Sequence, residues 1–199
     1  MRLLLIFVVC LLLGAEASAR VQELREAASP NRRYAVKAVE KGNPVQISYE
    51  IVSRRSGAVL LRLPSSYQPE EGEGDWSWEH TIQAEVSWST DSRYVAIDEQ
   101  VHRYIGDVLV AEVGEVNRSI RIPEESLVAR TGRSWSRYRV RLREGWLPNG
   151  RLALGLAGKV VASTDENQIS TYKHIQFRFL LRFKHGKAAI AQLDPPEDF

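Results

Sequence analysis

Apolar and polar residues alternate along most of the chain, which is the pattern of half-buried β-strands. Between positions 45 and 52, for example, Val45, Ile47, Tyr49 and Ile51 share one face. We expect strands over residues 34–39, 45–52, 58–63, 81–88, 94–101, 107–113, 151–162, 175–183 and 188–193. Short turns rich in Gly, Pro, Asn and Ser join many of them, so neighbouring strands should pair as antiparallel hairpins. The predicted fold class is all-β, built from antiparallel meanders.

One segment departs from this pattern. Pro123 and two glutamates open the stretch 123–130, and Gly132 follows it. These residues are typical of the start and end of a helix, so we predict at most one short helix there. The next segment, 138–143, alternates apolar residues with arginine, which favours an edge or half-exposed strand. A helical continuation from Ser134 remains the alternative.

The N-terminus has the features of a secretory signal peptide: Arg2, an apolar run over residues 3–13, and small residues at 17–19 before a cleavage point near Arg20. The run is about half of the roughly 20 residues that cross a bilayer, so we expect no transmembrane segment after cleavage. The expected division is a signal peptide over residues 1–19, a charged lead-in segment over 20–28 with one face suited to a short helix, a single β-rich domain over 29–193, and a flexible tail over 194–199.

The single cysteine, Cys10, lies in the predicted signal peptide, so the mature chain would contain no thiol. A chain without disulfides must be stabilised by core burial, which a domain of this size can supply. Export of a cysteine-free chain is commoner in bacteria, and we predict a secreted or periplasmic protein of the bacterial envelope. The formal net charge of +2 does not favour nucleic acid as a partner.

A short turn motif occurs three times along the chain. Aligned on Arg33, Arg93 and Arg151, the copies are 60 and 58 residues apart, and each leads into an alternating strand. An Asn or Asp two residues before the arginine can cap the turn with its side chain. This period predicts three related β units. Their approximate limits are 29–63, 81–113 and 146–193.

The three copies resemble the repeat of TolB-like β-propellers, in which an aromatic or apolar residue precedes Ser-Pro-Asp-Gly and a basic residue opens the next strand. Trp88 and Trp146 match the aromatic position, Pro30 and Pro148 the proline, and Gly150 the glycine. The resemblance covers only the turn and strand cores. It implies propeller-like sheets with both tryptophans buried at equivalent positions. Because a closed propeller typically has about 4 to 8 blades, we prefer a compact antiparallel β domain, with an open propeller-like array as the alternative.

Candidate catalytic residues are sparse. The sequence has no nucleophile-elbow serine, no phosphate-binding glycine loop and no metal-ligand spacing, so we predict no metal and no cofactor. Whether the protein is an enzyme stays open, because a carboxylate pair for hydrolysis is defined in space rather than along the chain. The place for such a pair would be Asp98 and Glu99 beside His102.

Arginine is the strongest compositional anomaly, with eight residues between positions 118 and 143. On a strand, Arg139, Arg141 and Arg143 would form one exposed face, while Tyr138, Val140 and Leu142 would pack inward. Guanidinium groups suit carboxylate, sulfate or phosphate ligands. A charged edge that resists strand pairing is the other interpretation.

From these features we predict a non-catalytic binding or interaction module whose ligand is an envelope protein or an anionic polysaccharide. The alternative is a secreted hydrolase that uses carboxylates around Asp98, Glu99 and His102. The candidate ligand-binding residues are Arg139, Arg141, Arg143, Trp76 and Trp78.

Overall fold

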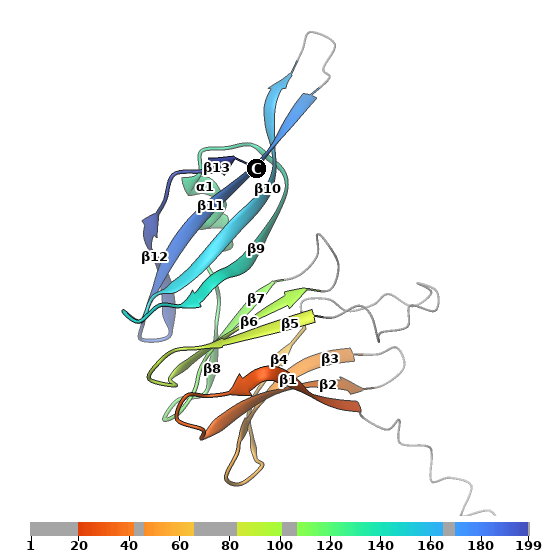
Figure 1. The fold of residues 1–199 in the computed structure, drawn as a ribbon, viewed down its shortest axis with the longest axis vertical. Coiled ribbons are helices and arrows are strands. Elements are labelled where there is room, and N and C mark those ends of the chain that lie inside the picture. Colours follow the sequence, from red (N-terminus) through yellow and green to blue (C-terminus); the bar gives the residue numbers. More distant parts are fainter. Residues whose placement is uncertain (1–19, 42–45, 66–82, 101–106, 165–169, 199) are drawn as a thin grey trace, which may run out of the picture.

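The computed structural model describes residues 20–41, 46–65, 83–100, 107–164 and 170–198. These residues form thirteen strands and one short helix, and the strands make three separate antiparallel sheets (Figure 1). Strands that are consecutive in sequence are neighbours in each sheet, except for the last strand of the chain, and none of the sheets closes into a barrel. The predicted all-β class, with meanders and one short helix, is therefore confirmed. Within the described ranges, no helix has the length and apolarity needed to span a membrane.

The three sheets follow one another along the chain. Sheet 1 contains β1 (Arg20–Ala28), β2 (Tyr34–Lys41), β3 (Gln46–Ser53) and β4 (Val59–Pro64). Sheet 2 contains β5 (Gln83–Trp88), β6 (Tyr94–Gln100), β7 (Val108–Glu112) and β8 (Arg118–Ile120). Helix α1 (Glu124–Arg130) leads into sheet 3, which contains β9 (Trp135–Trp146), β10 (Leu152–Thr164), β11 (Ser170–Lys184), β12 (Lys187–Leu193) and β13 (Glu197–Asp198).

Several boundaries differ from the sequence prediction. The lead-in 20–28 is strand β1, because its backbone pairs with β2 across the sheet instead of forming a helix. The predicted flexible tail contains β13, which pairs with Ile175 and Gln176 of β11. The third predicted unit begins at residue 146, yet the preceding strand β9 pairs with β10 in the same sheet. Each sheet therefore begins one strand before its motif turn.

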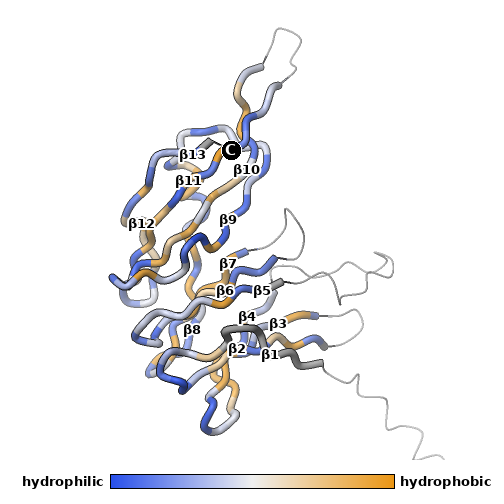
Figure 2. Tube along the Cα trace, in the orientation of Figure 1, coloured by the Kyte–Doolittle hydropathy of each residue, from blue (hydrophilic) through white to orange (hydrophobic). Residues whose placement is uncertain are grey.

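The middle sheet is buried on both faces. All β6 residues from Tyr94 to Glu99 are buried. Tyr94 and Ala96 belong to a core shared with sheet 3 and α1, whereas Val95 and Ile97 belong to a core shared with sheet 1. Figure 2 shows the same distribution along the chain, since its hydrophobic stretches lie mainly on strands and most of the turns are hydrophilic.

The three motif turns share most of their backbone hydrogen bonds. In each, an Asn or Asp side chain accepts the N–H of the arginine two residues later, at 2.9, 3.0 and 3.1 Å. The intervening residue has a positive φ in all three, 57° at Arg32, 60° at Ser92 and 73° at Gly150. Glycine adopts this conformation without strain, so only the third copy has the residue that the turn favours. In the third turn, the backbone hydrogen bond that closes the turn spans one residue fewer than in the other two turns.

The same type of aromatic pair joins neighbouring sheets beside these turns. Tyr34 of sheet 1 stacks on Trp88 of sheet 2, with ring centroids 6.2 Å apart, and Tyr94 of sheet 2 stacks on Trp146 of sheet 3 at 5.4 Å. Trp146 also packs on Phe183 at 4.9 Å. Trp146 is 8% exposed, but Trp88 is only half-buried. The expectation that both tryptophans are buried is therefore correct only for Trp146.

This difference predicts unequal effects of truncation. Trp146→Ala should lower the free energy of unfolding by about 3–5 kcal/mol, because it removes a buried ring from the larger core. Trp88→Ala should cost clearly less, since solvent already reaches its ring. Urea denaturation of both variants, followed by circular dichroism, measures the two losses. Equal losses would contradict the packing described here.

Candidate functional site

Asp98 and Glu99, the carboxylates considered for hydrolysis, point to opposite faces of β6. Asp98 points toward sheet 3, where its carboxylate accepts hydrogen bonds from Leu142 N at 2.8 Å and Arg139 Nη2 at 2.7 Å. Glu99 is fully buried toward sheet 1. Because the two groups diverge, they do not form the converging carboxylate pair that glycoside hydrolysis requires. His102 lies outside the described residues.

Each of these carboxylates is held by groups from a neighbouring sheet. The hydroxyl of Tyr49 donates to Glu99 at 3.0 Å, and Ser65 Oγ donates to the same carboxylate. Burial and the Glu99 charge raise the pKa of Tyr49, so its hydroxyl stays protonated. Burial also raises the pKa of Asp98, although the Arg139 guanidinium and the Leu142 N–H act in the opposite direction. Asp98 and Glu99 therefore connect the middle sheet to its two neighbours.

Removal of either partner of the Asp98–Arg139 pair should destabilise the fold. The side chains of Arg139 and Asp98 are only 13% and 10% exposed, so each single substitution leaves an uncompensated buried charge. We expect Asp98→Ala and Arg139→Ala each to cost about 3–5 kcal/mol, and the double variant to cost less than the sum. A double-mutant cycle by urea denaturation measures this coupling. Additive losses would show that the pair does not link β6 to β9.

The three arginines predicted as a binding face do not form one exposed surface. Arg139 is mostly buried by its ion pair with Asp98. Arg141 donates to Gln176 Oε1 at 2.7 Å, and Arg143 binds both carboxylate oxygens of Glu197 at 2.8 and 2.9 Å. An external anion would have to compete with these internal acceptors. Trp76 and Trp78 lie outside the described residues.

The prediction for the inward face of β9 is correct in part. Val140 and Leu142 are buried as expected, whereas Tyr138 is 39% exposed. Tyr138 is held in position by an edge-to-face contact with Trp135, whose ring centroid is 6.0 Å away. Instead of entering the core, Tyr138 lines an open groove.

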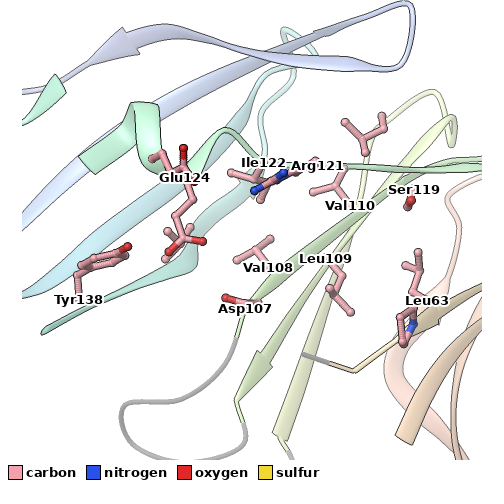
Figure 3. Close-up of a pocket in the computed structure, with 14 residues that line it drawn as sticks. Leu63, Asp107, Val108, Leu109, Val110, Ser119, Arg121, Ile122, Glu124 and Tyr138 are labelled. Atoms are coloured by element: carbon pink, nitrogen blue, oxygen red, sulfur yellow. The ribbon is translucent and has the colours of Figure 1, made fainter. Parts of the chain in front are cut away.

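This groove has a volume of about 510 Å³ and lies between sheets 2 and 3, with the end of β4 at its far side (Figure 3). We call it the β7–β9 groove. The segments that line it are Leu63–Pro64, 107–110, 119–122, 124–125 and the β9 residues Tyr138 and Val140. It forms where the short strand β8 ends and the chain turns toward α1.

The β7–β9 groove has an apolar floor. Val108, Val110, Ile120 and Val140 are all at most 7% exposed and belong to the core shared by sheets 2 and 3. Ile122 packs against the same core. A ligand in the groove would therefore contact side chains that the fold already fixes in place.

One end of the β7–β9 groove is acidic. Asp107, Glu124 and Glu125 lie here, with Arg121 as the basic residue of the lining. Burial raises the pKa of Glu124, and the neighbouring Asp107 charge raises it further, although the nearby Tyr138 hydroxyl and the Arg121 charge act in the opposite direction. Burial and the Glu124 charge likewise raise the pKa of Tyr138. Three carboxylates thus share one end of the groove with a single guanidinium.

A second groove, of about 550 Å³, lies at the first two motif turns and the β7–β8 connection. Its charged lining residues are Arg33, Asp91, Arg93, Glu112 and Glu115. Of these, only Glu112 is buried, and its carboxylate binds Arg93 and Arg118 at 2.6 and 2.5 Å. Burial acts to raise the pKa of Glu112, but hydrogen bonds from both arginines outweigh it and lower the pKa. Because this acid is already neutralised internally, the β7–β9 groove is the stronger candidate.

No sequence motif predicts the β7–β9 groove. Asp107, Glu124 and Tyr138 come from three separate segments, and only the fold brings them together. Glu124 and Glu125 were interpreted solely as residues that begin a helix. Among the described residues, no group of three or more His, Cys, Asp or Glu side chains could hold a metal ion.

Comparison of the chain with protein-family models, curated protein sequences and solved structures found no match. The resemblance to TolB-like propellers therefore rests on the turn motif alone.

Proposed function

We propose that this protein is an exported, non-catalytic β-rich interaction module that binds a segment of a partner protein in the β7–β9 groove. The observation that supports this function is the open groove of about 510 Å³, with a rigid apolar floor and polar groups at one end. Binding sites in proteins commonly have this composition, with volumes of about 300–1,000 Å³. Such a groove accommodates a few side chains of an extended segment.

A protein ligand fits this site better than an anionic polysaccharide. The acidic end of the groove would repel sulfate or phosphate groups. The arginines that favoured a polyanion in the sequence are engaged with internal partners, as Arg143 is with Glu197. The hydrolase alternative lacks support as well, because Asp98 and Glu99 diverge.

Export remains part of the proposal and is supported by the signal-peptide pattern of residues 1–19. In the same way, we propose that the three sheets form an open propeller-like array, because their first strands β1, β5 and β9 lie next to one another in sequence order. A protein with an exposed groove in the envelope would meet exported partners.

The mature chain should begin near Arg20. Expression with residues 1–19 intact, followed by mass spectrometry of the periplasmic fraction, determines the N-terminus. Material that retains Met1 after export would contradict cleavage by signal peptidase.

Binding at the groove can be tested with a neutral peptide. We expect an octapeptide of alternating leucine and serine, added to ¹⁵N-labelled protein from the periplasm, to shift the amide resonances of residues 108–110, 119–122 and 138–140. Ser119→Trp should abolish these shifts, because Ser119 is exposed in the groove and an indole would fill it. Ser126→Trp is the matched control, since Ser126 is exposed on α1 outside the groove lining.

A heparin hexasaccharide provides the competing outcome. Shifts of residues 139–143 with the hexasaccharide, without groove shifts from the peptide, would overturn the protein-binding proposal in favour of an anionic glycan.

A further inference from the structure

The β7–β9 groove has two chemically different parts, and together they define what its occupant must carry. Val108 and Val140 form apolar floor beside the acidic end, where Glu124 lies between Tyr138 and Asp107 (Figure 3). A basic side chain has the same two parts, an apolar stem and a charged head. Its length allows the stem to contact the floor while the head reaches the carboxylates.

We propose that this end of the groove binds a lysine or arginine side chain, so that the partner is an apolar segment carrying a basic residue. This inference rests on the proposed function of the groove as a protein-binding site. It adds that a basic residue of the partner segment determines which part of that segment lies in the groove.

Charge complementarity is the main argument. Burial removes part of the hydration of the Glu124 carboxylate and raises its pKa, and repulsion by Asp107 and, to a smaller extent, by Glu125 raises it further. Arg121 offsets only part of this negative charge. An incoming cation relieves the repulsion among the carboxylates and gains charge-assisted hydrogen bonds. The position of Glu124 and Glu125 in the first turn of α1 explains their presence in the helix, but it does not explain Asp107, which directly precedes β7 of sheet 2.

Tyr138 supplies a second recognition element. Tyr138 lies beside Glu124, and its ring contacts Trp135 while the residue remains 39% exposed. An exposed aromatic face beside carboxylates favours an ammonium or guanidinium group through cation–π attraction. A metal ion fits less well, because the carboxylates here do not form a metal-binding group within the described residues.

The test compares three octapeptides that alternate leucine and serine and differ only at one central position, which is lysine, norleucine or glutamate. Calorimetry and amide shifts of the periplasmic protein give affinity and location. We expect the lysine peptide to bind in the groove about five- to tenfold more tightly than the norleucine peptide, and the glutamate peptide to bind most weakly. The advantage of lysine should shrink as salt is raised.

The variants Asp107→Asn and Glu124→Gln should remove the preference for lysine while leaving the norleucine peptide bound. Glu85→Gln, which neutralises an exposed carboxylate on β5 outside the groove, should keep the preference. Equal affinity of the wild-type protein for the lysine and norleucine peptides would overturn this inference and leave the proposed function intact. Absence of groove shifts with all three peptides would overturn both.

Discussion

The burial of strand β6 on both faces is the constraint on which the rest of the structure depends. A four-stranded sheet with one apolar face can form a domain only if another layer of structure covers that face. Sheet 2 provides this layer twice, because Ala96 faces one core and Ile97 the other. The buried acids Asp98 and Glu99 continue the same alternation, and each binds polar groups of a different neighbouring sheet. Both outer sheets thus depend on one central strand.

The outward faces of sheets 1 and 3 carry ion pairs. On the outer side of sheet 1, Glu50 lies opposite Lys37 and forms a 2.6 Å ion pair with Arg62. On sheet 3, Arg178 binds both Glu144 and Asp194 at 2.6 Å. The functional consequence is that the accessible apolar surface of the β7–β9 groove lies at the side of the array, between sheets, rather than on an end face.

The sequence predicted local features better than those that depend on distant residues. Alternation has a period of two residues, so most strands were recognisable, and Pro123 and Gly132 located the helix. By contrast, the backbone of 20–28 forms a strand because of its pairing with β2, and the partner of Arg143 is Glu197, 54 positions away. The groove depends on the same kind of contact. The acidic residues of the groove belong to no common sequence motif. Only the packing of the helix against the sheets brings them together.

Native-state hydrogen exchange tests the central role of β6 most directly. If both outer sheets depend on this strand, the amides of residues 94–99 should exchange only through global unfolding, with the same free energy as urea denaturation. Amides of β1 and β12, at the edges of sheets 1 and 3, should exchange through smaller openings. Exchange of β6 at lower free energy than either outer sheet would contradict the account, because sheets 1 and 3 would then be stable without the strand between them.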